Sequence, residues 1–171
     1  MMGTKPTSIV VGVDGTPAGA QALGFALREA SLRGGQVDVV TTWEWTIPYD
    51  RAYQDDATEA RVQAEKAQDD AIQSALQGMQ TPPDVNRHIV RDKAGSALVR
   101  LSRDADYLVV GNSHKNLVTR TLLGSVSSFC VRHAHCPVVV VPPTAQQGPP
   151  EPIDEQEVAP GSTPTTSRSL D

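Results

Sequence analysis

Five short apolar runs alternate along the chain with stretches whose apolar residues recur at helical spacing. The runs show little alternation of apolar and polar residues, which is typical of strands covered on both faces in a parallel sheet. The regular succession of strand and helix predicts an α/β fold with an open, five-stranded parallel sheet and helices on both faces. We predict strands over Ser8–Val13, Gln36–Thr42, Asn86–Val90, Tyr107–Gly111 and Pro137–Val141, the third being the weakest.

Four helices are predicted between these strands. The first begins at Thr16-Pro17, because threonine is a favoured N-cap and proline a favoured first helical residue, and Gly34-Gly35 ends it. The other three are expected within Asp56–Gln77, over Ser96–Arg103 and from Gly124 to His133.

The composition predicts one folded domain followed by a tail. Of the 171 residues, 39% are apolar but only 4% aromatic, so small aliphatic side chains must fill the core. From residue 143 onward the chain is rich in proline and acidic residues and poor in apolar ones. The acidic residues there are Glu151, Asp154, Glu155, Glu157 and Asp171. We therefore expect a domain over residues 1–142 and a disordered tail over residues 143–171, because such a tail buries too little apolar surface to offset its ordering entropy.

Charge and hydropathy argue against several classes of partner. The net charge of −5 does not suit a protein that binds nucleic acid or an anionic membrane surface, because both need a basic face. The N-terminal segment has no long apolar stretch, and no run of about 18 apolar residues occurs. We therefore expect a cytoplasmic protein, and two cysteines do not form a disulfide framework.

The most informative stretch joins the fourth strand to the last helix. A polar loop follows Gly111, and a helix begins near Gly124-Ser125. The unpaired N–H groups and positive dipole end of a helix start favour phosphate, and glycine permits close backbone approach. Side chains nearby that add hydroxyl donors or positive charge are Ser125, Ser127, Ser128, Lys115 and Arg120.

The spacing of this stretch resembles the nucleotide-binding pattern of the universal stress protein family, Gly-x2-Gly-x9-Gly-Ser/Thr. Here the pattern is Gly111-x2-His114-x9-Gly124-Ser125. The opening IVVGVDGTPAGAQAL and the ending CPVVVV are also similar to the family, so the resemblance covers about residues 7–142. It implies a Rossmann-like fold with strand order 3-2-1-4-5, and a homodimer formed through the last strand, Val138–Val141.

The implied strand order also predicts where a ligand binds. Strands 1 and 4 become neighbours with crossovers on opposite sides of the sheet, and open α/β sheets bind ligands at such a point. By resemblance, Asp14 contacts the ribose of ATP or a Mg²⁺ ion that bridges its phosphates, while Thr42 and Val90 lie beside the adenine. The residues expected to form the ATP site are Gly12, Asp14, Gly15, Thr42, Val90, Gly111, Asn112, Ser113, His114, Lys115, Gly124, Ser125, Val126 and Ser127.

One residue departs from the pattern, because His114 stands where ATP-binding members of the family have glycine. Its imidazole either donates a hydrogen bond to the phosphates or obstructs them. The first hypothesis is an ATP-binding regulatory dimer of the stress response. Two alternatives stay open: a nucleotide-free dimeric interaction module whose pocket His114 closes, and a slow ATPase. Catalysis is not favoured, because the chain lacks a Walker lysine, a G-x-S-x-G elbow and a recognisable base.

A cluster of potential zinc ligands lies near the end of the predicted domain. It consists of Cys130, His133, His135 and Cys136. Structural zinc sites usually pair their ligands around a loop, whereas these ligands would be divided between a helix and a strand. We therefore interpret Cys130 as a small core residue rather than a metal ligand.

Overall fold

Five parallel strands form the centre of the fold, in the order β3-β2-β1-β4-β5. The computed structural model describes residues 6–44, 54–112 and 123–142. The strands are β1 (Ser8–Gly12), β2 (Gln36–Trp43), β3 (Asp84–Arg91), β4 (Tyr107–Gly111) and β5 (Val138–Val141). The predicted parallel sheet and its strand order are therefore confirmed.

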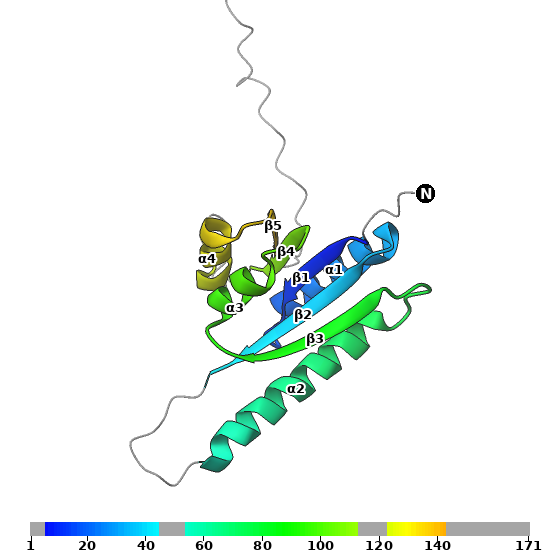
Figure 1. Cartoon of the computed structure of the whole chain (residues 1–171). Helices are drawn as coiled ribbons and strands as arrows, with labels where there is room; N and C mark the ends of the chain where they lie inside the picture. Colours follow the sequence, from blue (N-terminus) through cyan, green and yellow to red (C-terminus); the bar gives the residue numbers. More distant parts are fainter. Residues whose placement is uncertain (1–5, 45–53, 113–122, 143–171) are drawn as a thin grey trace, which may run out of the picture.

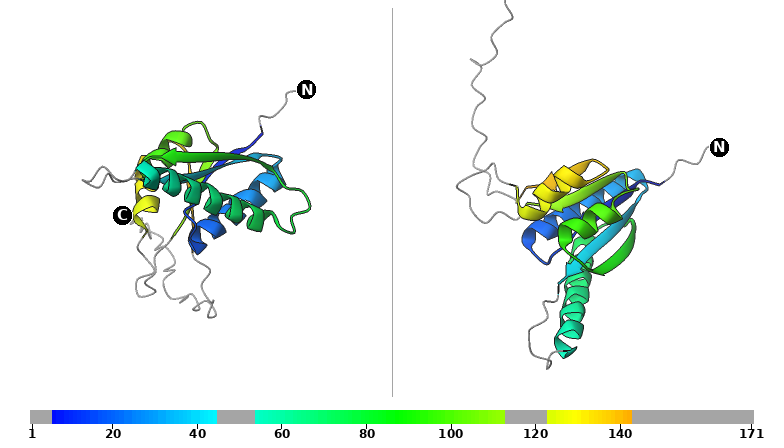
Figure 2. Two further views of the ribbon diagram at one scale, coloured as in Figure 1. Left: turned by 90° about the horizontal axis from the view of Figure 1, so that it is seen from below. Right: turned by 60° about the vertical axis from the view of Figure 1, so that its left-hand side comes forward.

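Helices cover the two faces of this sheet in pairs (Figure 1). They are α1 (Pro17–Arg33), α2 (Gln54–Leu76), α3 (Ala94–Leu101) and α4 (Ser125–His133). The helices α1 and α2 pack on one face, and Figure 2 shows them together beneath the sheet in its left view. The helices α3 and α4 pack on the other face. Within the described ranges, no helix is both long and apolar enough to cross a membrane.

The core has two halves, one on each face of the sheet. Along β1, Ile9 and Val11 belong to the half beneath α1 and α2, while Val10 belongs to the half beneath α3 and α4. All three side chains are at most 1% exposed. The apolar runs lack alternation because successive side chains point to opposite faces and both faces are buried.

Several predicted boundaries were wrong by one or two residues, at positions where tertiary contacts set the ends. The third strand is longer than expected, because β3 pairs along its whole length with β2, from Asp84 to Arg91. The polar sequence of β3 did not indicate its full length, because β3 is an edge strand with several exposed side chains. The helix α3 begins two residues earlier than predicted, after Lys93 in an extended conformation, and ends before Ser102.

The remaining shifts are small. The helix α2 starts at Gln54 rather than within Asp56–Gln77, β1 ends at Gly12, and β5 starts at Val138. The prediction of the first helix start was confirmed: Thr16 is the N-cap of α1 and Pro17 its first residue. Gly34 caps the other end in the left-handed conformation, with φ of 60°.

Candidate functional site

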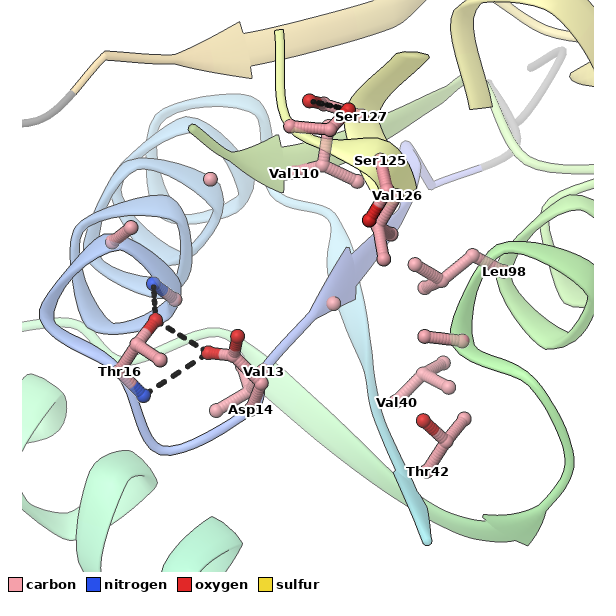
Figure 3. A pocket seen from close by; sticks show the side chains of 16 residues that line it. Val13, Asp14, Thr16, Val40, Thr42, Leu98, Val110, Ser125, Val126 and Ser127 are labelled. Carbon is pink, nitrogen blue, oxygen red and sulfur yellow. Dashed lines mark hydrogen bonds between the residues drawn. The ribbon is translucent and has the colours of Figure 1, made fainter. Parts of the chain in front are cut away.

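A cavity opens at the carboxyl ends of β1, β2 and β4 (Figure 3). The empty space in and above it is about 630 Å³, a figure that includes open solvent. The chain leaves β1 for α1 on one face and β4 for α4 on the other, so the cavity occupies a topological switch point. The residues that line it are Gly12, Val13, Asp14, Thr16, Ala18, Gly19, Val40, Thr42, Ala94, Leu98, Val110, Gly111, Gly124, Ser125, Val126 and Ser127.

At the start of α1, on one wall of the cavity, backbone N–H groups already donate hydrogen bonds to side chains. The Thr16 hydroxyl accepts a hydrogen bond from the backbone N–H of Gly19 at 3.2 Å. The same hydroxyl donates to Asp14 Oδ1 at 2.6 Å, and the Thr16 N–H donates to that oxygen at 3.0 Å. A carboxylate at a helix N-terminus offsets the positive dipole end, so this helix start is a poor phosphate site.

The start of α4, on another wall of the cavity, has no such cap from the residues that the structure describes. Gly124 is its N-cap and supplies no side chain, and the first intrahelical bond runs from the Ser128 N–H to the Gly124 carbonyl at 2.8 Å. The N–H groups of Ser125, Val126 and Ser127 precede that bond and belong to the unpaired first turn of the helix. All three residues line the cavity. The donors that an anion needs are therefore concentrated on the α4 wall.

Asn112 joins the elements behind this wall. Its side-chain oxygen accepts a hydrogen bond from the Gly124 N–H at 3.3 Å, and its own N–H donates to the Val141 carbonyl at 2.9 Å. One residue thus connects the end of β4, the end of β5 and the start of α4. Its role in this structure is to position the helix start, because Asn112 does not itself line the cavity.

The third wall is largely apolar. Val40 and Thr42 on β2 share it with Leu98 on α3 (Figure 3). Ala94, the first residue of α3, also lines the cavity. Such a surface accommodates a flat aromatic ring better than a phosphate, because charged groups lose solvation against apolar side chains. The cavity is therefore lined both by an apolar surface and by a surface rich in N–H and hydroxyl donors.

Two glycines of the predicted site are required by neighbouring packing. A Cβ atom on Gly111 would lie 2.6 Å from the carbonyl carbon of Ala18, and closer still to its oxygen. A Cβ atom on Gly12 would lie 2.9 Å from Cδ1 of Leu98. The absence of side chains at these positions lets α1 and α3 approach the strand ends and shapes the cavity floor.

The structure brings together most, but not all, of the residues predicted for the site. Gly12, Asp14, Thr42, Gly111, Gly124, Ser125, Val126 and Ser127 line one cavity. Gly15 lies in the adjacent turn, where its φ of 75° favours glycine. Val90 is not among the residues that line the cavity, and its side chain packs, partly buried, against the half of the core beneath α3 and α4. Ser113, His114, Lys115 and Arg120 lie outside the described residues.

Sequence reasoning missed Thr16, Val40 and Leu98 as cavity residues. Val40 precedes Thr42 by two positions on β2, so the two-residue period of a strand predicts that they share a face. Leu98 lies within the predicted third helix, where an apolar residue by itself does not distinguish a binding wall from the core. Thr16 was recognised only as a helix cap.

The cysteine and histidine cluster does not converge on a metal-binding arrangement. Across residues 6–44, 54–112 and 123–142, no group of three or more His, Cys, Asp or Glu side chains is placed to hold an ion. Cys130 is fully buried in the core between α4 and the sheet, which confirms its interpretation as a core residue. Burial raises the pKa of its thiol to about 11, with a smaller contribution from Cys136.

Comparisons with known proteins agree with the fold and show the family. The sequence model of the universal stress protein family matches residues 6–142. Universal stress protein Rv2623 of Mycobacterium tuberculosis is 35% identical over 156 residues, covering 81% of this chain and 48% of that protein. The chain thus spans about half the length of the curated relatives it matches. The chain belongs to the universal stress protein family.

Solved structures of the family share this fold. Universal stress protein UspA from Lactobacillus plantarum superposes with a TM-score of 0.65 at 21% identity, over 81% of this chain and 99% of that one. A universal stress protein in complex with cAMP gives 0.58 at 24% identity, over 81% and 98%. A family member from Arabidopsis thaliana with AMP bound gives 0.56 at 18% identity, over 85% and 97%.

Proposed function

We propose that this protein binds an adenine nucleotide, ATP in the first instance, in the cavity between β1, β4 and the start of α4. One observation carries the proposal: the start of α4, which has no side-chain cap among the described residues, and an apolar wall line the same cavity. Phosphate oxygens suit the first, and a purine ring suits the second. Relatives of the same fold that hold cAMP or AMP support the choice of an adenine nucleotide.

In this arrangement different walls of the cavity bind different parts of the nucleotide. The N–H groups of Ser125, Val126 and Ser127 donate to phosphate oxygens, while Val40 and Leu98 pack against the base. Asp14 keeps Oδ1 on Thr16, which leaves Oδ2 for a ribose hydroxyl or for a Mg²⁺ ion on the phosphates. A carboxylate and phosphate oxygens suit Mg²⁺, which prefers hard oxygen ligands.

The proposal extends to a regulatory role in the stress response. The protein would form a homodimer in the cytoplasm through β5, which lies at the edge of the sheet and pairs only with β4 among the described strands. Nucleotide changes dimer or partner contacts only if it binds two states with different affinity. Sedimentation as a monomer at every concentration would remove the dimer from the proposal, and cell fractionation tests the location.

A pair of variants at Ser125 isolates the backbone donors. Ser125 is the first residue of α4 and follows Gly124 in an extended conformation with ψ of 164°, so proline fits there. Ser125→Pro removes the N–H and the hydroxyl, whereas Ser125→Ala removes the hydroxyl alone. One hydrogen bond to a charged phosphate contributes about 1.5–3 kcal/mol, so Ser125→Pro should bind Mg-ATP roughly 10-fold or more weakly than Ser125→Ala.

Isothermal calorimetry with Mg-ATP provides the measurement, and mass spectrometry of the heat-treated purified protein shows whether a nucleotide accompanies it. No heat at millimolar ATP with the unmodified chain would overturn the proposal. Equal affinity of the two Ser125 variants would place the phosphates elsewhere. Binding by His114→Gly alone would instead support the nucleotide-free interaction module, and ATP turnover that Asp14→Ala abolishes would support the slow ATPase.

A further inference from the structure

A second hollow lies between α3 and α4, at the ends of these helices that point away from the nucleotide cavity. It encloses about 910 Å³, again partly open to solvent. Val99 and Phe129 form its apolar floor, and both side chains are half-buried. The ring of Phe129 stacks on the imidazole of His133, with ring centroids 4.2 Å apart and planes inclined by 24°.

Basic groups surround this floor. Arg100, Arg103, His133 and His135 all line the hollow and are exposed. Arg100 is paired with Asp92 at 3.0 Å. Among the described residues, Arg103 and His135 have no ion-pair or hydrogen-bond partner.

His133 is fixed on one side only. A carbonyl oxygen only accepts, so the 2.8 Å contact with the Phe129 carbonyl assigns a proton to His133 Nδ1. Nε2 has no partner among the described residues. We call these exposed basic residues the rim of the hollow. The rim thus has one guanidinium, that of Arg103, and two imidazoles, those of His133 and His135, that are available to a ligand.

We propose that residues 149–157 of this chain dock in the hollow. That segment reads PPEPIDEQE: it holds three prolines, one isoleucine and four acidic residues, and no basic residue. Proline-rich segments bind in aromatic-lined grooves because their extended conformation loses little entropy on binding. The prolines and Ile153 match the floor of Val99 and Phe129, and the acidic residues match the basic rim.

The length of chain available permits this contact. The hydrogen bonds of Asn112 place Val141, where β5 ends, beside the start of α4. The hollow lies at the other end of α4, a helix of nine residues and about 14 Å. Glu151 is ten residues beyond Val141, and ten extended residues span roughly 33–36 Å. The segment therefore reaches the hollow by running back along α4.

Nuclear magnetic resonance of the full chain labelled with ¹⁵N tests the proposal without removing any residue. Arg103→Glu reverses the free charge in the hollow, and Arg61→Glu makes the same change at an exposed position of α2. Arg103→Glu should shift the amide signals of residues 149–157 toward their values in 1 M salt, whereas Arg61→Glu should leave them unchanged. Salt has this effect because the Debye length falls from about 8 Å at 0.15 M to about 3 Å at 1 M.

Charge exchange strengthens the test. Arg103→Glu combined with Glu155→Arg should restore part of the shift, and His135→Glu should repeat the effect of Arg103→Glu at a second rim position. Signals of residues 149–157 that are identical in the unmodified chain and in both rim variants would overturn the proposal. Shifts that vanish on dilution would also overturn it, in favour of the tail of a second copy. Docking needs no nucleotide, so the outcome is independent of ATP binding.

Discussion

Replacement of Gly111 by alanine tests whether the first glycine of the motif is required by packing. The new Cβ would lie 2.6 Å from the carbonyl carbon of Ala18, whereas ordinary contact begins at 3.4 Å. The obstacle is backbone at the start of α1 rather than the end of a flexible side chain. Relief therefore requires a shift of the helix or of β4, both of which contribute to the core.

The magnitude follows from two opposing effects. Overpacking of this kind costs about 1–3 kcal/mol, and the upper part of that range applies because backbone cannot rotate away. Alanine recovers about 0.4–1 kcal/mol by restricting the unfolded chain. We expect a net loss of about 2 kcal/mol in the free energy of unfolding, which lowers Tm by roughly 6–10 °C for a domain of this size.

Urea unfolding followed by circular dichroism measures this loss, with Gly24→Ala as the matched control. A Cβ on Gly24, inside α1, meets only the guanidinium of Arg28, at 3.3 Å from Nη1, and that group is free to move. Gly24→Ala should therefore stabilise the protein by about 0.5–1 kcal/mol through helix propensity. The reasoning is refuted if Gly111→Ala unfolds at the same or a higher urea concentration than the unmodified protein.

Three further predictions concern buried groups on α2, β4 and α4. Gln68→Leu should destabilise the protein by about 1–3 kcal/mol in the same assay, because the Gln68 amide donates to the carbonyl of Val39 at 3.0 Å and to the Thr41 hydroxyl at 3.1 Å inside the core. Tyr107→Phe should be neutral or stabilise by up to about 1 kcal/mol, because the buried Tyr107 hydroxyl interacts with Glu29 and Arg33 but forms no hydrogen bond of good geometry among the described residues. Between pH 9 and 11 the urea midpoint should fall, because the unfolded thiol of Cys130 ionises near its ordinary pKa of 9.0 while the folded thiol keeps its proton up to about pH 11. Below pH 9 the stabilisation that comes from the raised pKa of the Cys130 thiol is fully present. A fall of the same size in the urea midpoint of Cys130→Ala would contradict the assignment of the effect to Cys130.

Sequence patterns predicted the architecture because each pattern is local. The valine runs indicated strands buried on both faces, and Thr16-Pro17 marked a helix start that the structure confirms. The strand order came from the resemblance to the family, and the structure confirms it. The third strand was underestimated because β3 is defined by its pairing with β2 rather than by its own polar sequence.

The site was predicted less completely than the fold. The convergence of Asp14, Gly111 and Gly124 on one cavity follows from the strand order, although about 100 residues separate the first from the others. Sequence reasoning also assigned Val90 to the site, but Val90 is not among the residues that line the cavity. The ligand roles of these residues remain predictions.

The sequence by itself determined the alternation of strand and helix, the helix start at Thr16 and the family to which the chain belongs. Only the tertiary structure decided which helix start stays open, because Asp14 occupies the start of α1 whereas no side chain of the described residues caps α4. It also decided that Asn112 links β4, β5 and α4, and that the backbone of Ala18 leaves no room for a Cβ atom on Gly111. Local backbone preferences are encoded in neighbouring residues, whereas these contacts join residues brought together by packing of the whole sheet.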